Sequence, residues 1–286
     1  MDGAIFLQQV VNGMSLGGMY ALIAIGYTMV YGVLRLINFA HADVMMVGAF
    51  STLFLFSSVG LPFGVAVFLT LGLCGLFGML IDRVAYRPLR QASKISMLIT
   101  AIGVSFFLEN LFNVLFGGSS RFFSAPDFFN QTRAFGSVII TNVAWIVPLI
   151  TVLLLLAIRA VAFDVNTVRL MGIDANRIIS LVFALGSSLA ALGGVFYSIS
   201  YPTIDPLMGV LIGLKAFAAA VLGGIGSVTG AVLGGFILGF TEVVAVAIFP
   251  ELGGYKDAFA FLFLILVLLF RPVGIMGDER LERSRF

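Results

Sequence analysis

The chain has 286 residues, of which 60% are apolar and only 10% are charged. Soluble domains carry about 25% charged residues, so this chain has too little polar surface to cover a water-soluble globule. Its 33 Gly and 29 Phe, set among long runs without charge, are typical of a polytopic helical membrane protein instead. A single cysteine, Cys74, excludes an internal disulfide.

Hydrophobic runs predict the membrane spans in chain order. A helix needs roughly 20 residues to cross a hydrocarbon core about 30 Å thick. The charge-free run 44–81 is much longer, so we expect a turn at Ser57-Ser58-Val59-Gly60-Leu61-Pro62. We predict one all-α transmembrane domain, a helix bundle over residues 1–286, with about nine hydrophobic segments: 4–34, 36–58, 61–81, 95–117, 142–162, 177–200, 207–227, 229–249 and 257–273. Eight crossings remain open, if one glycine-rich piece is a broken or re-entrant helix.

Basic residues predict the orientation of this bundle. Most of the 16 Lys and Arg lie in three segments, at about 83–94, 158–177 and 271–286. By the positive-inside rule these two loops and the C-terminal tail face the cytoplasm, and the loop at about 118–141 is external. With nine crossings, the N-terminus then lies outside.

Motifs for enzyme chemistry are missing from the sequence. No G-x-x-x-x-G-K-[ST] occurs, so the chain has no P-loop for nucleotide phosphates. One His and one Cys leave no His/Cys metal cluster and no nucleophile–base pair with alternatives. We therefore expect no catalytic residue, no metal and no cofactor in this chain.

Polar residues interrupt the apolar runs between 35 and 43. Asn38, the only histidine His41, and Asp43 fall within six residues, where unpaired polar groups in a membrane cost several kcal/mol. One interpretation is a broken helix whose freed backbone and side chains line a translocation path. The other is a helix cap, in which Asn38 or Asp43 binds the free amides of the next helix.

A second unusual stretch is rich in glycine. Gly226, Gly230 and Gly234 recur every four residues, which predicts one small-residue helix face for close packing. The dense glycines before them favour a helix break, and Gly223, Gly224 and Gly226 are candidates for a gate hinge. Tight packing followed by a turn is the alternative.

Lys215 lies inside the same apolar region. Its ammonium group could reach toward an interface. It could also pair with Asp205, Glu109 or Glu242, and the sequence does not choose between these partners.

The segment 163–176 places apolar residues beside charges between two spans. Such an apolar patch in a cytoplasmic loop predicts a docking helix for another protein. An amphipathic loop resting on the membrane is the alternative. The candidate docking residues are Asp164, Thr167, Val168, Arg169, Leu170, Met171 and Gly172.

The external loop carries four phenylalanines. Phe122, Phe123, Phe128 and Phe129 either receive an external protein or form an interfacial aromatic belt.

Blocks in register along nearly the whole chain resemble one known family. They are Asn12-Gly13, Tyr20-Ala21-Leu22, Tyr31-Gly32-Val33-Leu34-Arg35-Leu36-Ile37-Asn38-Phe39-Ala40-His41, Arg87-Pro88-Leu89-Arg90, Leu98-Ile99-Thr100-Ala101-Ile102-Gly103, Arg169-Leu170-Met171-Gly172-Ile173, the stretch 215–235, and Arg271-Pro272-Val273-Gly274. Together they resemble the permease subunits of ATP-binding-cassette importers for branched-chain amino acids, the Liv-type first permease. The chain departs from the family's usual pattern at Ala42 and Val168, and in its short basic stretch after Ile158.

The resemblance implies partners and a location. It implies half of a translocation path in the bacterial inner membrane, paired with a second related permease or a copy of itself. Two cytoplasmic ATPase subunits would bind Mg-ATP, an external binding protein would deliver the solute, and no nucleic acid is involved. Relatives also carry urea, amides or aromatic acids, so the substrate stays open. Two other classes are a secondary transporter, with Asp43, Glu109 and Glu242 as coupling carboxylates, and a passive channel.

Overall fold

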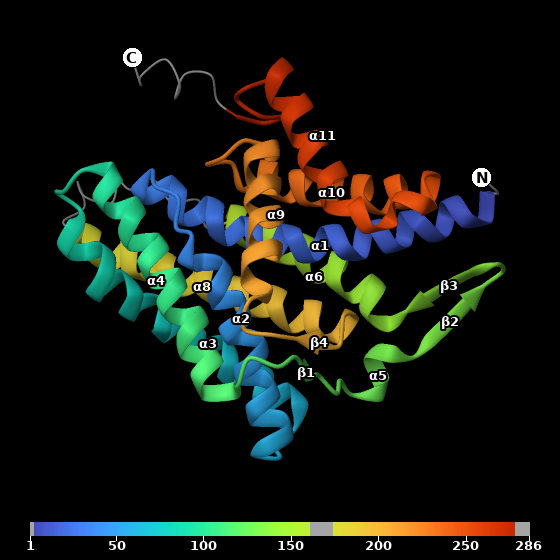
Figure 1. The fold of residues 1–286 in the computed structure, drawn as a ribbon, viewed down its shortest axis with the longest axis horizontal. Coiled ribbons are helices and arrows are strands. Elements are labelled where there is room, and N and C mark those ends of the chain that lie inside the picture. Colours follow the sequence, from blue (N-terminus) through green and yellow to red (C-terminus); the bar gives the residue numbers. More distant parts are fainter. Residues whose placement is uncertain (1–2, 161–173, 278–286) are drawn as a thin grey trace.

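The structure is a computed structural model that describes residues 3–160 and 174–277 (Figure 1). Its main helices are α1 (Gly3–Leu34), α2 (Ala40–Leu53), α3 (Phe63–Ile81), α4 (Lys94–Phe116), α6 (Asn142–Ala160), α8 (Ala175–Ser200), α9 (Met208–Gly223), α10 (Val228–Ile248) and α11 (Lys256–Phe270). Short helical pieces are the π turns Phe54–Ser58 and Asp82–Tyr86, the 3-10 turns Arg87–Leu89 and Pro250–Tyr255, and α5 (Asp127–Asn130). The predicted helical membrane bundle is confirmed.

Among the described residues, eight helices are long and apolar enough to cross a membrane. The ninth apolar helix, α9, has 16 residues and therefore extends only about 24 Å. It begins just after a strand that pairs with the loop following α4, and it ends against residues 274–277, which follow α11. The short helix thus connects the two ends of the bundle without filling a full membrane thickness.

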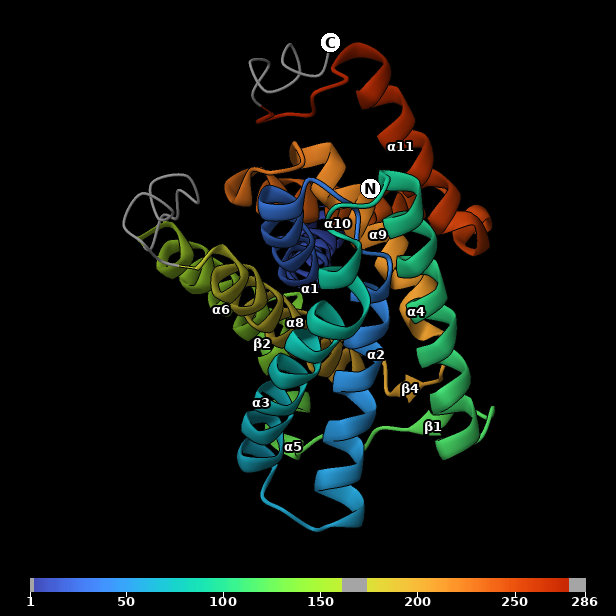
Figure 2. The same ribbon diagram turned by 90° about the vertical axis from the view of Figure 1, so that its left-hand side faces the viewer.

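The chain between α1 and α2 is not helical, so the predicted segment 36–58 begins as a helix only at Ala40. Arg35 has a φ of 52°, in the left-handed region that breaks a right-handed helix. At the other end of α2, the turn predicted at residues 57–62 is present. Figure 2 shows this turn at the lower end of the molecule and the beginning of α4 at the upper end.

Short strands, which the sequence did not predict, organise the loop between α4 and α6. β1 (Arg121–Phe122) pairs antiparallel with β4 (Thr203–Ile204), and β2 (Thr132–Phe135) forms a hairpin with β3 (Val138–Thr141). The side chain of Gln8 donates a hydrogen bond to the carbonyl of Ile139 at 2.9 Å and accepts one from its amide at 2.8 Å. The beginning of α1 therefore lies at the same end of the molecule as this hairpin.

α1 is the central helix, and glycines bring α10 against it. The two helices lie side by side in Figure 1. A Cβ on Gly239 would collide with the backbone of Gly17, and a Cβ on Gly235 would lie 2.6 Å from the amide nitrogen of Ala21. Since real Cβ atoms do not approach so closely, these positions accept only hydrogen.

A second glycine face of α10 packs on α9. A Cβ on Gly230 or Gly234 would collide with the carbonyl oxygens of Gly223 and Ala219. The predicted small-residue face is therefore present at these two positions. Gly226 precedes the helix, with a φ of 99° and open space around it, so it does not belong to that face.

Candidate functional site

Asn38 is held by a side chain far away in the sequence. Its Oδ1 accepts a hydrogen bond of 2.6 Å from the hydroxyl of Tyr86, and both residues are buried. Phe39 is the N-cap residue of α2, and no side chain caps this helix. The capping interpretation therefore does not describe Asn38, which ties the break between α1 and α2 to the end of α3.

His41 lies inside the bundle. Its Nε2 is 3.2 Å from the carbonyl oxygen of Ile23. The centroid of its ring is 4.6 Å from the ring centroid of Tyr27. A Cβ on Gly26 would collide with the imidazole, so this glycine makes room for it. His41 thus joins the first turn of α2 to the middle of α1, and only 1% of its surface is exposed.

Asp43 is the least satisfied of the three polar residues. Neither carboxylate oxygen has a hydrogen-bond partner at ordinary geometry within the described ranges, although Ser105 and Glu109 of α4 lie close enough to interact electrostatically. Gly209 at the start of α9 packs against it, because a Cβ there would lie 2.8 Å from Oδ1. Asp43 does not cap α2 either, and a buried carboxylate without a partner is costly.

Lys215 is paired, and not extended toward an interface. Its Nζ lies 2.8 Å from Glu242 Oε1 on α10 and 2.5 Å from Asp257 Oδ1 on α11. The Tyr20 hydroxyl of α1 donates to the other oxygen of Glu242 at 2.9 Å. Glu242 was one of the three predicted partners, whereas Asp257 was missed, although it opens the last apolar helix. We call these four residues the Lys215 cluster.

An open cleft of about 750 Å³ reaches this cluster from the end of the molecule that carries the β2–β3 hairpin. Its walls come from α1, α6, α8 and α10. Polar side chains along it include Asn12, Ser15, Asn130 and Ser200, with Glu242 at the Lys215 cluster. A cleft that carries polar side chains on mainly apolar walls, and that runs from one end of a membrane bundle to a buried charge cluster, is a candidate entrance for a small solute.

The candidate hinge glycines lie in a turn that the chain's tail closes. Gly224, with a φ of 103°, follows α9. The amides of Ile275 and Met276 donate to the carbonyls of Leu222 and Gly223 at 2.9 and 2.8 Å. The segment after α11 is thus hydrogen-bonded to the end of α9, which fits tight packing with a turn.

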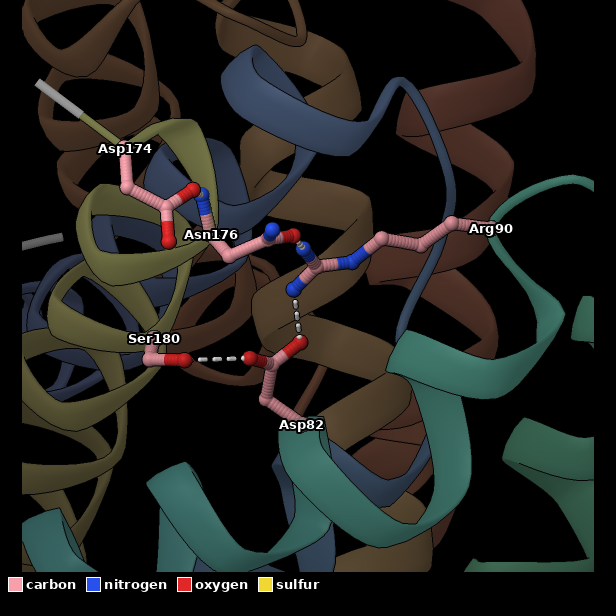
Figure 3. Close-up of polar contacts among 5 residues, drawn as sticks. All are labelled: Asp82, Arg90, Asp174, Asn176 and Ser180. Atoms are coloured by element: carbon pink, nitrogen blue, oxygen red, sulfur yellow. Dashed lines mark hydrogen bonds and ion pairs between the residues drawn. The ribbon is translucent and has the colours of Figure 1, made fainter. Parts of the chain in front are cut away.

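A polar network, drawn in Figure 3, joins the end of α3 to the beginning of α8. One guanidinium nitrogen of Arg90 lies 2.5 Å from Asp82 Oδ1, and the other donates to the side chain of Asn176. Ser180 donates to the second oxygen of Asp82 at 2.6 Å. Asp174 caps α8 by accepting from the amide of Asn176 at 2.9 Å. We call Asp82, Arg90, Asn176 and Ser180 the Arg90 brace, which connects two of the segments predicted to be cytoplasmic.

Comparison with known proteins decides the family. Residues 9–268 match the family described as branched-chain amino acid transport system / permease component. The chain belongs to this permease family. It is 41% identical to the high-affinity branched-chain amino acid transport system permease protein BraD of Pseudomonas aeruginosa, over 97% of this chain and 98% of that protein.

Further relatives are similar over most of their length. The permease protein LivH of Escherichia coli K12 is 40% identical, with 97% of both chains covered. The probable branched-chain amino acid transport permease protein LivH of Methanocaldococcus jannaschii is 26% identical, over 90% of this chain and 88% of that one. The chain is thus a multi-pass membrane permease component, as the motifs indicated.

Two predicted contact regions of the permease have different outcomes. All candidate docking residues, from Asp164 to Gly172, lie outside the described residues. Of the four external phenylalanines, Phe122 and Phe128 are exposed, Phe123 is buried, and Phe129 packs against Phe63 of α3. Only half of that aromatic group therefore offers an outer surface.

Proposed function

We propose that this permease forms one half of the translocation path of an ATP-driven, binding-protein-dependent importer for branched-chain amino acids. The observation that carries the proposal is the alignment with BraD and LivH, which spans 97% of the chain at 40–41% identity and whose names specify this transport. Urea, amides and aromatic acids are the other substrates to test.

The energy for transport would come from separate subunits. The sequence has no P-loop, and two cytoplasmic ATPase subunits would bind the Mg-ATP instead. A second permease, related or identical, would complete the path, and an external binding protein would bring the solute. In support, α4, α6 and α11 expose most of their apolar surface, which lipid or a second permease must cover.

The orientation would follow the basic segments. We place the C-terminus and the loops at about 83–94 and 158–177 in the cytoplasm of a bacterium, and the loop 118–141 outside its inner membrane. The Arg90 brace supports this, because it joins the two basic loops at one end of the bundle. The contact of Gln8 with Ile139 supports an external N-terminus.

Coupling would run through α8. ATP binding would move the docking segment 163–176, and Asp174, which caps α8, begins the helix that receives this movement. The bundle would then shift between outward-open and inward-open populations. Asn38, His41, Asp43 and Lys215 would contribute to the path where the non-helical break and α9 meet, and Gly223, Gly224 and Gly226 would permit movement of the turn.

The test is purification of the permease from its native membrane, followed by reconstitution with the subunits that accompany it. We expect an ATPase, a second permease and a binding protein, and uptake of leucine, isoleucine or valine that requires ATP. Preferential uptake of urea or an aromatic acid would overturn the proposed substrate class. Uptake by the purified chain alone, with or without an ion gradient, would overturn the importer proposal in favour of a secondary transporter or channel.

A further inference from the structure

A second cleft, of about 420 Å³, lies between the end of α3 and the beginning of α8. It shares a wall with the Arg90 brace, and Figure 3 shows the Asp174, Asn176 and Ser180 part of that wall. We call it the arginine notch. Its lining consists of Met79, Arg83, Arg87, Asp174, Asn176, Arg177, Ser180 and Leu181.

The notch has excess positive charge. Arg83, Arg87 and Arg177 are exposed, and none of them forms an ion pair with another residue in the described part of the chain. The neighbouring carboxylate of Asp82 cannot neutralise them, because it already binds Arg90 and Ser180. Among the described residues that line the notch, only Asp174 carries a negative charge, and it caps α8.

Apolar surface continues from the notch along both helices. Met79 and Leu181 form part of the lining, and Leu76 and Leu185 lie one turn farther into the spans, 63% and 43% exposed. The two helices cross closely, because Gly75 and Gly78 of α3 pack against serine and alanine side chains of α8. The two helices therefore expose positive charge at the notch and apolar side chains one turn farther along.

We propose that the arginine notch binds the phosphate of an anionic phospholipid, whose acyl chains lie along Leu76, Leu80 and Leu185. Guanidinium groups bind phosphate oxygens in pairs. Basic pockets between transmembrane helices on the cytoplasmic side bind anionic headgroups. An acidic protein surface would match the three arginines but not the exposed leucines beneath them, and free phosphate would not use these leucines either. This lipid site is independent of the transported solute.

The test uses the full chain in phosphatidylcholine nanodiscs with added phosphatidylglycerol, and native mass spectrometry counts the phosphatidylglycerol retained. We expect Arg83→Gln, Arg87→Gln and Arg177→Gln each to weaken retention about fivefold, and the triple variant by roughly 100-fold or more. Arg133→Gln, an exposed arginine of the β2–β3 hairpin, is the matched control and should retain lipid like the wild type. The single variants keep the test valid if the triple variant does not fold.

Further measurements separate the lipid from other ligands. Glycerol phosphate, which has a phosphate but no acyl chain, should not displace the lipid, and neither should inorganic phosphate. Displacement by either at equal occupancy would show a free-phosphate site and overturn the proposal. Unchanged lipid retention in the arginine variants would also overturn it, and loss of the copurifying ATPase in those same variants would identify the notch as a protein contact.

Discussion

A lysine can be buried in a membrane bundle only when its charge is matched. Lys215 has two carboxylates within ion-pair distance, and Tyr20 satisfies an oxygen that Lys215 does not use. The cluster joins four helices, α1, α9, α10 and α11. Removing one charge leaves the others unpaired, which costs more than the pair itself contributes.

Lys215→Met should therefore destabilise the permease by about 3–5 kcal/mol, because it leaves the buried Glu242 carboxylate without its cation. The measurement is the thermal unfolding midpoint in detergent, with exposed Lys94→Met as control. Lys215→Met/Glu242→Gln should recover part of the loss. An unfolding midpoint for Lys215→Met equal to that of Lys94→Met would contradict the structural role of the cluster.

Arg90→Lys should weaken the brace although it keeps the positive charge. The two guanidinium nitrogens bind Asp82 and Asn176 separately, and a single ammonium cannot reproduce this fork. One hydrogen bond to a charged group is worth about 1.5–3 kcal/mol. We expect fewer solute molecules imported per ATP hydrolysed in the reconstituted complex, while the subunits still copurify. The same import ratio as in the matched variant Arg133→Lys would refute this coupling role.

Sequence reasoning identified several of the buried polar residues but, apart from Glu242 for Lys215, not their partners. Asn38, His41, Asp43 and Lys215 stand out because each is a polar group in an apolar run. Tyr86 lies 48 residues from Asn38, and Asp257 sits on another helix from Lys215, so only packing brings these pairs together. Pattern and charge identify a group that needs a partner, and tertiary structure selects that partner.

At the scale of helices, glycine determines how closely α10 approaches its neighbours. One of its faces, with Gly235 and Gly239, meets α1, and another, with Gly230 and Gly234, meets α9. α10 therefore contacts both helices through backbone atoms. Close van der Waals packing, with no side chain between the helices, sets the distance between their axes.

Gly239→Ala should destabilise the bundle by about 1–3 kcal/mol, because the added methyl collides with the backbone of Gly17. Gly103→Ala is the control, since a Cβ at Gly103 on α4 meets nothing within 4 Å. In that exposed helix, alanine should be neutral or stabilise by up to about 1 kcal/mol. The unfolding midpoints of both variants measure the difference, and equal effects would argue against the close α1–α10 crossing.

Helix positions were largely predictable, and the strands were not. Long apolar runs, one of them interrupted only by Glu109, predicted α4 and α6 to within two residues. The two-residue strands β1 and β4 are too short to show a pattern, and they pair residues far apart in sequence. The unpredicted beginning of α2 depends on the left-handed conformation of Arg35, a residue type without a preference for it.

At the scale of the whole molecule, the beginning of α4 and the β2–β3 hairpin lie on opposite sides in Figure 1. The turn between α2 and α3 and the loop before α4 are both exposed and offer positions for labelling. Introduced cysteines can be labelled selectively, because the only native cysteine, Cys74, is buried.

A membrane-impermeant maleimide should label Ser58→Cys in intact cells, and Gln91→Cys only after the membrane is opened. This expectation follows from the positive-inside rule, which places the Arg83–Lys94 loop in the cytoplasm. The wild type, with Cys74 alone, is the control and should stay unlabelled. Labelling of Gln91→Cys in intact cells would contradict this orientation of the permease.

Hydrogen bonds from Ile275 and Met276 to the end of α9 also bear on the order of synthesis. The ribosome makes the end of α9 about fifty residues before it makes Ile275 and Met276, which bind it. Those intervening residues form α10, α11 and their turns. The end of α9 therefore gains these two hydrogen bonds only after the last helix has been made. A premature stop just after Phe270 should therefore leave α9 unsecured and open to proteases that spare the complete chain.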